Sequence, residues 1–262
     1  MEFQTILFEM RETSAIIRLN RPKAMNAVNG QMVEEIGLAL DEAENEPALR
    51  GLVLTGEGKE FCAGADLKFV LSELESGRPL REGFLGNVCR LLTRLEAFPM
   101  PTIAAVNGLA LAGGLELLLC CDLIVAVESA TIGDAHSNYG MIPGGGATQR
   151  LPRRLGNSRA KQLLFLGRSY SARDLQQWGL VNMVVPDGEL EQSIESIIST
   201  LSEKSPLGLR KMKFLVNRGM ESTPREGLEL ELEAFEEYQG SYDIKEGLQA
   251  FKEKRSPVFE GR

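Results

Sequence analysis

Residues 104–116 read Ala-Ala-Val-Asn-Gly-Leu-Ala-Leu-Ala-Gly-Gly-Leu-Glu. The apolar run Ile103–Val106, with a β-branched residue at each end, predicts a buried strand, and Asn107-Gly108 predicts a turn after it. Gly113-Gly114 then opens an apolar segment of about two helical turns, and residues 122–127 predict another strand. The stretch therefore predicts a strand, a helix and a strand in close succession, as in an α/β protein.

The same stretch contains a candidate reaction site. Gly113 and Gly114 let other groups approach the backbone closely and leave first-turn N–H groups free for a negatively charged oxygen. Glu116, three residues on, would project a carboxylate beside that oxygen. Backbone donors that face an oxyanion, with an acid/base beside them, are what enolate chemistry requires. A tight turn followed by an acid that favours the helix dipole is the structural alternative.

Composition narrows the class of protein. The 262 residues carry a net charge of −8, which offers no basic face to nucleic acid or to an anionic membrane, although a few local Lys and Arg side chains can still hold an anionic ligand. The four cysteines show no C-x-x-C spacing, so neither a zinc site nor a disulfide framework is expected. The protein is therefore expected in a reducing compartment. We expect a cytoplasmic protein without metal, nucleic-acid or membrane partners.

Working outward, strands alternate with helices for about two thirds of the chain. Strands are predicted at Thr5–Phe8, Ala15–Leu19, Leu49–Thr55 and Leu180–Val185, and helices from Asn29 and over Leu67–Leu74, Val88–Phe98, Leu151–Leu166 and Ser171–Trp178. Beyond them, Glu189–Leu201, Pro206–Gly219, Arg225–Tyr238 and Ile244–Lys254 predict a nearly all-helical final part. Ser76–Gly86 has the composition of a mobile loop near a site entrance. The alternation indicates parallel strands joined by helical crossovers.

Five motifs, in order along the chain, carry a resemblance to a known family. They are Leu19-Asn-Arg-Pro-Lys-Ala-Met-Asn-Ala27, Phe61-Cys-Ala-Gly-Ala-Asp66, Asn107–Leu117 with Cys121-Asp122, Ile142-Pro-Gly-Gly-Gly-Ala-Thr-Gln-Arg-Leu151 and Glu246–Phe259. Each is weak alone, but together they resemble the crotonase (enoyl-CoA hydratase/isomerase) superfamily over essentially the whole chain.

The resemblance implies an α/β fold, a spiral of ββα turns built from near-perpendicular sheets. Residues 1–200 would form the crotonase-like core that binds acyl-CoA, and residues 201–262 a helical region that drives formation of a homotrimer or of a hexamer of two trimers. The partners implied are an acyl-CoA thioester substrate and further copies of the chain. No separate cofactor is implied, because coenzyme A is part of the substrate, and the setting would be fatty acid metabolism.

The resemblance also implies the site. The N–H groups of Ala65 and Gly113 would form the oxyanion hole for the thioester carbonyl. By analogy with other oxyanion holes, each donor would stabilise the enolate by about 3–4 kcal/mol. The residues implied along the substrate and its coenzyme A portion are Lys23, Ala24, Ala63, Ala65, Asp66, Leu67, Lys68, Gly113 and Gly144.

One position departs from the pattern. Hydratases of this family carry two glutamates that share the catalytic water; Glu116 matches the first, while the second falls on His136, the single histidine of the chain. Imidazole can perform the acid/base work of a carboxylate, with an ordinary pKa of about 6.5. We therefore expect Glu116 and His136 to act as the acid/base pair of an enoyl-CoA hydratase. Double-bond isomerisation, decarboxylation or thioester hydrolysis on the same scaffold, or a catalytically silent CoA-binding trimer, are the alternatives.

Overall fold

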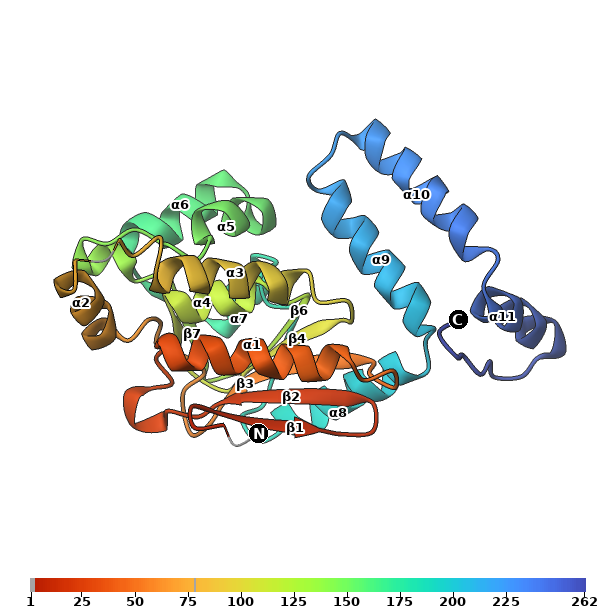
Figure 1. Ribbon diagram of the computed structural model, residues 1–262, viewed down its shortest axis with the longest axis horizontal. Helices are drawn as coiled ribbons and strands as arrows, with labels where there is room; N and C mark the ends of the chain where they lie inside the picture. The colour runs from red at the N-terminus through yellow and green to blue at the C-terminus, as the bar shows by residue number, and fades with distance from the viewer. Residues whose placement is uncertain (1–2, 78) are drawn as a thin grey trace.

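The computed structural model describes residues 3–77 and 79–262 (Figure 1). Within them, a six-stranded sheet has the order β1 (Ile6–Met10), β2 (Ser14–Leu19), β3 (Gly51–Gly56), β4 (Thr102–Val106), β6 (Leu123–Val127) and β9 (Met183–Val185). β1 is antiparallel to β2, and every other neighbouring pair is parallel. A three-stranded sheet in the same described part joins β5 (Ala110–Leu111), β7 (Thr131–Gly133) and β8 (Ser169–Ser171).

The helices follow the strands as the alternation predicts. They are α1 (Gly30–Glu44), α2 (Leu67–Glu75), α3 (Phe84–Glu96), α4 (Gly113–Leu119), α5 (Ala147–Leu155), α6 (Asn157–Leu166), α7 (Ala172–Gln177), α8 (Leu190–Ser202), α9 (Pro206–Gly219), α10 (Pro224–Tyr238) and α11 (Tyr242–Glu253), with short 3-10 turns η1 (Pro22–Ala24) and η2 (His136–Tyr139). The prediction of parallel strands with helical crossovers is confirmed.

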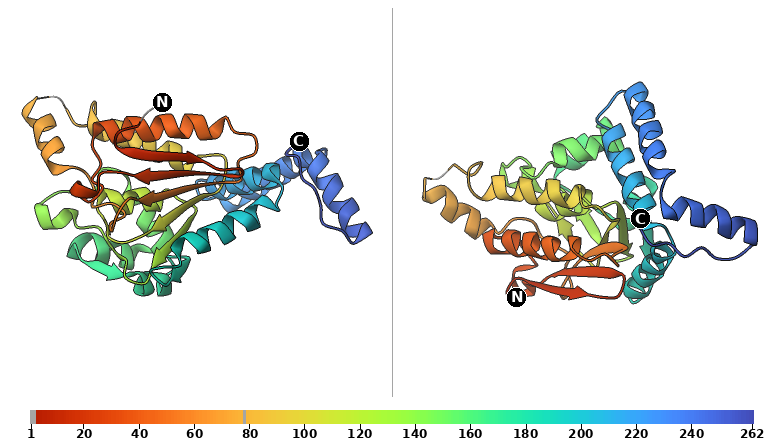
Figure 2. Two further views of the ribbon diagram at one scale, coloured as in Figure 1. Left: turned by 90° about the horizontal axis from the view of Figure 1, so that it is seen from below. Right: turned by 45° about the vertical axis from the view of Figure 1, so that its right-hand side comes forward.

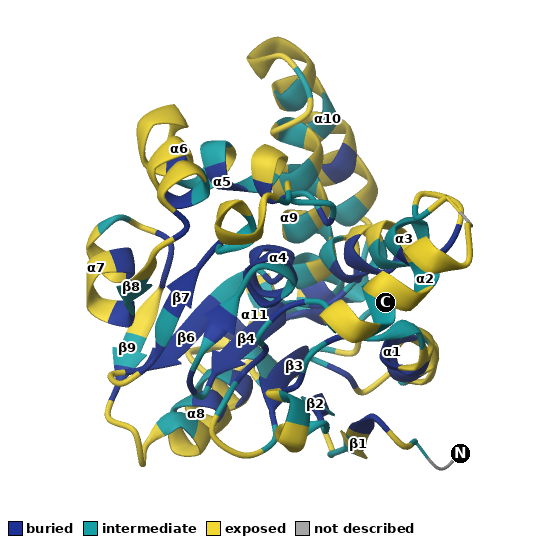
Figure 3. Ribbon diagram, turned by 90° about the vertical axis from the view of Figure 1, so that its left-hand side faces the viewer, coloured by how far each residue is buried: buried dark blue, intermediate teal, exposed yellow. Residues whose placement is uncertain are grey.

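Both faces of the large sheet are covered, which explains its continuous apolar strands. Because side chains alternate along a strand, Ala104 and Val106 of β4 point into the main core, which α1, α3 and α4 also fill. Ile103 and Ala105 point to the other face, where they meet Ile194 and other apolar residues of α8. The buried residues gather at β4, β6 and α4, in the middle of the molecule (Figure 3). The candidate site is thus built on a deeply buried part of the fold.

Several boundaries differ from the sequence prediction; the strand expected over Leu180–Val185, for example, is β9 at Met183–Val185. The prediction of a single helix over Leu151–Leu166 is wrong, because Gly156, at φ 76° and ψ 163°, separates α5 from α6. The start of a helix at Val88 is also wrong, since α3 begins at Phe84. The loop expected over Ser76–Gly86 includes residue 78, which lies outside the described residues. The two-residue strand β5 and the three-residue β8 were not predicted, because so short a segment leaves no periodic pattern.

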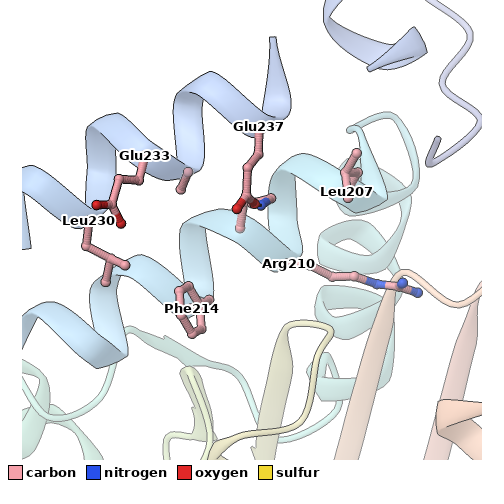
Figure 4. A pocket seen from close by; sticks show the side chains of 8 residues that line it. Leu207, Arg210, Phe214, Leu230, Glu233 and Glu237 are labelled. Carbon is pink, nitrogen blue, oxygen red and sulfur yellow. The ribbon is translucent and has the colours of Figure 1, made fainter. Parts of the chain in front are cut away.

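The C-terminal helices extend away from the sheets. Both Figure 1 and Figure 2 show α10 and α11 reaching beyond the rest of the molecule, while α9 lies between them and the core. A hollow of about 430 Å³ separates α9 from α10 (Figure 4); it is lined by Leu207, Arg210, Lys211, Phe214, Leu230, Glu233, Ala234 and Glu237. None of the residues that the sequence places at the reaction site lines this hollow. The division into residues 1–200 and 201–262 stays a prediction.

Candidate active site

Two backbone N–H groups from distant segments meet beside the start of α4. Gly113 is the first residue of α4, so its N–H has no partner within the helix. Ala65 lies in an extended segment whose neighbours bond to Val28: the Val28 N–H donates to the Gly64 carbonyl at 2.8 Å and the Asp66 N–H to the Val28 carbonyl at 2.8 Å. Because successive N–H groups of an extended chain point to opposite sides, the Ala65 N–H faces away from Val28.

The two donors are close together. A Cβ built on Gly113 would lie 3.3 Å from the Ala65 nitrogen, and one built on Gly64 would lie 3.2 Å from the Gly113 nitrogen. Among the hydrogen bonds of residues 3–77 and 79–262, neither N–H donates to a protein acceptor. The arrangement offers two preorganised donors to one oxygen, which is the geometry that stabilises an enolate or a tetrahedral oxyanion.

Close contacts fix this junction. A Cβ on Gly114 would lie 2.1 Å from the Cys62 carbonyl oxygen, so the backbone of α4 can approach this segment only with glycine there. Ala112, just before the helix, has φ 49° and ψ −113°, a conformation that L-residues rarely adopt. Such strain persists where the surrounding structure holds the backbone in place, and it concentrates at functional sites.

The carboxyl group of Glu116 is buried in the first turn of α4, the helix that Gly113 opens. Only 3% of the residue is exposed, and Oε1 accepts the N–H groups of Gly145 at 2.7 Å and Ala147 at 3.1 Å. Burial raises the pKa of Glu116 above its ordinary value, although the two N–H groups and the nearby His136 oppose the shift. Glu116 can therefore exchange a proton at a pH closer to neutrality than an exposed glutamate.

His136 stands at the start of η2, held by a buried acid. Its Nδ1 is 2.9 Å from Oδ1 of Asp134, and its N–H donates to Oδ2 of the same carboxylate at 3.2 Å. Burial lowers the pKa of His136, but the hydrogen bond to Asp134 and the charges of Asp134 and Glu116 outweigh it, so the pKa is raised. Glu116 and His136 each act on the pKa of the other, which places them in one electrostatic unit.

The two segments predicted to hold coenzyme A also lie together. The Ala63 N–H donates to the Met25 carbonyl at 3.0 Å, and Arg21 forms an ion pair with Asp66 at 2.8 Å. These bonds join the loop of residues 20–28 to the segment that carries Ala65. A hollow of about 300 Å³ opens on this loop, lined by Asn20, Arg21, Pro22, Lys23 and Ala24.

Comparison with known proteins identifies the family. The family model described as enoyl-CoA hydratase/isomerase matches residues 9–262. A crotonyl-CoA hydratase of Syntrophomonas wolfei is 40% identical over 263 residues, covering 99% of each chain, and a short-chain-enoyl-CoA hydratase of Clostridium acetobutylicum is 37% identical over 256 residues, covering 97% of each. An enoyl-CoA hydratase crystal structure from Geobacillus kaustophilus superimposes with a TM-score of 0.93, at 40% identity over all of both chains. An enoyl-CoA hydratase structure from Bacillus anthracis superimposes with a TM-score of 0.92, at 37% identity over 99% of this chain and 100% of that one.

The chain belongs to the enoyl-CoA hydratase/isomerase family. The predicted family and the crotonase-like α/β fold are both confirmed. No helix among the described residues is both long and apolar enough to cross a membrane. In the same part of the chain, no three His, Cys, Asp or Glu side chains are grouped as metal ligands would be.

The predicted site residues of this family member fall into three groups. Around the donors lie Ala63, Ala65 and Gly113, with the loop residues Lys23 and Ala24 attached through Met25. Gly144 instead lies on the acid/base side, next to Gly145, and its carbonyl accepts the thiol of Cys89 at 2.9 Å.

The start of α2 contains the remaining predicted residues. Leu67 and Lys68 are exposed on its first turn. The Asp66 carboxylate caps that helix by accepting the N–H groups of Lys68 and Phe69 while it pairs with Arg21, so the side chain of Asp66 orders the loop. The predicted roles of all these residues in catalysis and binding stay predictions.

Sequence reasoning missed two supporting residues, Asp134 and Arg150. Asp134 lies two residues before the single histidine, and that spacing is the signal that could have found it. Arg150 lies within the motif Ile142–Leu151; it donates to the Gly145 carbonyl at 2.7 Å and pairs with Glu96 at 2.7 Å. Nothing in its local pattern indicates that contact.

Proposed function

We propose that this protein adds water across the double bond of a 2-enoyl-CoA thioester, with Glu116 and His136 as the acid/base pair. The observation that carries the proposal is the placement of buried Glu116 one helical turn after Gly113, whose N–H lies beside that of Ala65. The family match supports it, and so do relatives named crotonyl-CoA hydratase and short-chain-enoyl-CoA hydratase.

The oxyanion donors provide the electronic part of the reaction. The N–H groups of Ala65 and Gly113 hold the thioester oxygen and draw electron density from the conjugated double bond toward it. Water then bonds to C3, and the electron pair of the double bond becomes an enolate whose negative oxygen the two N–H groups stabilise. The enolate collapses when C2 takes up a proton, so that one water molecule is added in total.

The pair of side chains moves the two protons. Glu116 Oε1 is an acceptor of two N–H groups, which favours the ionised form, and His136 is flanked by the carboxylates of Asp134 and Glu116, which favour the imidazolium. In this resting state Glu116 takes a proton from water and His136 gives one to C2. Transfer of a proton from Glu116 to His136 then restores the pair.

The coenzyme A portion would lie along the joined segments 20–28 and 61–68. The backbone of Ala63, Asp66 and Leu67 would flank the adenine and pantetheine, Leu67 from the first turn of α2, and Ala24 would lie along the same ligand. In the described residues, Lys23 and Lys68 form no ion pair within the chain, so both ammonium groups are free to meet phosphate. Gly144 would contact the acyl end. Coenzyme A enters as part of the substrate, and no other cofactor is needed.

Crotonyl-CoA tests the proposal. Loss of the conjugated enoyl-thioester absorbance is followed for the wild type, Glu116→Gln and His136→Ala, with Glu42→Gln, an exposed glutamate of α1, as the matched control. We expect both site variants to lose at least 100-fold in kcat and the control to keep its rate. Near wild-type hydration by Glu116→Gln would overturn the assignment.

Binding without hydration would overturn the reaction itself. If the wild type binds crotonyl-CoA and leaves it unchanged, turnover of a 3-enoyl-CoA, of a malonyl-type thioester or of the thioester bond would identify an isomerase, a decarboxylase or a hydrolase. No turnover across that panel would leave a silent CoA-binding protein.

We also propose that copies of this chain assemble through the C-terminal helices as a homotrimer, or as a hexamer of two trimers. Large apolar side chains on α10 and α11 are exposed in the single chain, among them Leu232 at 67% and Phe251 at 85%. A monomer rarely leaves such a surface in water. Sedimentation velocity on the wild type and on Leu232→Glu should give a trimer or hexamer and a smaller species, respectively; a monomeric wild type would contradict the proposal.

A cytoplasmic location completes the proposal. All four cysteines are free, and Cys62, Cys120 and Cys121 are buried, as thiols of a reducing compartment commonly are. Cell fractionation with an antibody against the protein tests this location.

A further inference from the structure

We propose that Asp134 is a positioning residue of the hydration reaction, which holds His136 so that Nε2 is the ring nitrogen that serves the substrate. The inference rests on the proposed function, because it assigns how the histidine of the acid/base pair is oriented. It concerns a residue that does not touch the substrate and acts through His136.

Two separate contacts tie His136 to the same carboxylate. Oδ1 of Asp134 meets the ring at Nδ1, 2.9 Å away, and Oδ2 accepts the backbone N–H of His136 at 3.2 Å. Ala135 between them adopts the left-handed conformation, with φ 63°, which turns the chain back so that both contacts form at once. Backbone and ring are therefore fixed by one acid, and the ring cannot rotate without breaking the shorter bond.

Burial makes this orientation lasting. The Asp134 side chain is 1% exposed, whereas that of His136 is 12% exposed. Water cannot replace the ring at the carboxylate, because the carboxylate is out of its reach. With Nδ1 directed at an acceptor, Nδ1 carries a hydrogen in both the neutral and the charged ring. Nε2 is then the nitrogen that gains and loses the proton.

The charges around the ring agree with this role. Asp134, between β7 and η2, and Glu116, on α4, are the charged groups that act on His136. Arg150, on α5, is paired with Glu96, and the charge of Glu116 helps to raise the pKa of Arg150. Two carboxylates against one imidazole favour the imidazolium, so loss of the Asp134 charge should release the ring proton at a lower pH.

Asp134→Asn removes the charge with almost no change of shape, and kinetics report its effect. We expect kcat for crotonyl-CoA hydration to fall at least about 10- to 100-fold, by analogy with the loss of carboxylates that orient metal-binding histidines, with KM nearly unchanged. The alkaline fall of the pH–rate profile should move to lower pH. In the His136→Ala background the same substitution should add almost nothing, because Asp134 has no histidine left to orient.

Nuclear magnetic resonance separates this inference from the proposed reaction. His136 is the single histidine, so a protein labelled with ¹⁵N in histidine gives one imidazole, whose tautomer and titration are read without any turnover. The wild type should show a ring that is protonated on Nδ1 when neutral, and Asp134→Asn should titrate at lower pH. A ring protonated on Nε2 would overturn the inference even in an active hydratase.

Other outcomes also decide the matter. An unchanged kcat in Asp134→Asn, or an equal further loss in the His136→Ala background, would assign Asp134 a purely structural part. If Asp134→Asn fails to fold, the tautomer of the wild-type ring still tests the inference. An inactive wild type with the Nδ1-protonated ring would refute the hydratase proposal and leave the orientation of His136 supported.

Discussion

The guanidinium of Arg150 donates to the carbonyl oxygen of Gly145 at 2.7 Å, while the N–H of that same glycine donates to Glu116 Oε1 at 2.7 Å. Gly145 is thus held through its carbonyl group by Arg150 of α5, and through its N–H group it holds the buried carboxylate of α4. Glu96 of α3 fixes Arg150 through a two-pronged ion pair, at 3.1 and 2.7 Å. Three helices therefore contribute to the position of one acid.

Arg150→Gln should loosen Glu116 without touching the substrate. We expect kcat to fall about tenfold with KM nearly unchanged, because misplacement of a catalytic group by a fraction of an ångström weakens the transition state more than the ground state. Steady-state kinetics with crotonyl-CoA check this. Arg153→Gln, on the same helix and exposed, is the control and should behave as the wild type. Equal effects of the two variants on kcat would refute the role of Arg150 in positioning Glu116.

The pH–rate profile should be a bell with both limbs displaced upward. Glu116 takes a proton only when ionised, so kcat/KM rises with pH as it ionises, above the ~4.3 of an ordinary glutamate, since burial raises its pKa. His136 gives a proton only when charged, so kcat/KM falls as pH passes its pKa, which is raised above ~6.5. The limbs report the pair as a unit.

Two variants check this profile. His136→Gln should lower the rate and abolish the alkaline fall, whereas Lys161→Gln, an exposed change on α6, should leave the bell in place. A wild-type profile that lacks the acid limb would contradict the assignment of Glu116, and one that lacks the alkaline limb would contradict that of His136.

Substitution by alanine should affect activity at Gly113 and stability at Gly114. In Gly113→Ala the new Cβ lies 3.3 Å from the Ala65 nitrogen, so the chain still folds but the methyl group occupies the space between the two donors. We expect kcat/KM to fall about 10²- to 10³-fold, as when an oxyanion donor is lost, with little change in Tm. In Gly114→Ala the Cβ would meet the Cys62 carbonyl at 2.1 Å, and we expect a stability loss of about 1–3 kcal/mol.

Thermal melts beside kinetics distinguish these two effects. Gly219→Ala, at an open position on α9 with nothing within 4 Å of the new Cβ, is the control for both. If Gly113→Ala loses as much stability as Gly114→Ala and keeps its kcat/KM, the two donors do not form the oxyanion site.

What the sequence could predict was carried by local signals. Asn29, whose side chain accepts the Met32 N–H, marks the start of α1, and Pro206 marks that of α9. Gly113 and Glu116 were found because their spacing matters within one helical turn. The helix break at Gly156, between α5 and α6, was not predicted, because the apolar pattern continues on both sides of it.

What the sequence could not predict depends on tertiary contacts. The Arg150–Gly145–Glu116 chain joins two helices whose mutual placement no local pattern gives. The two contacts of Asp134 with His136 require Ala135 to adopt the left-handed backbone conformation. Alanine rarely adopts this conformation, and here the surrounding fold imposes it. Each missed residue supports a catalytic candidate rather than being one, so the family motif does not single it out.

Among the contacts that attach α9 to the core is an ion pair that can be tested by itself. Nζ of Lys213, on α9, is 2.7 Å from Oδ2 of Asp122, which also accepts the N–H of Thr102 at 2.7 Å and its hydroxyl at 3.0 Å. The Lys213 side chain is 8% exposed, so removal of its partner leaves a nearly buried charge.

Asp122→Asn should therefore lower the free energy of unfolding by about 3 kcal/mol, the lower end for a broken buried pair, because Asp122 itself is 28% exposed. Lys213→Met alone should cost less, since Asp122 keeps both bonds from Thr102. The double variant should lose less than the sum of the two, which urea unfolding at fixed protein concentration measures as a coupling energy. Glu229→Gln, which breaks the exposed Arg225–Glu229 pair of α10, is the control and should change stability by less than about 0.5 kcal/mol. Strict additivity of the Asp122 and Lys213 variants would mean that this pair does not hold α9 to the sheet.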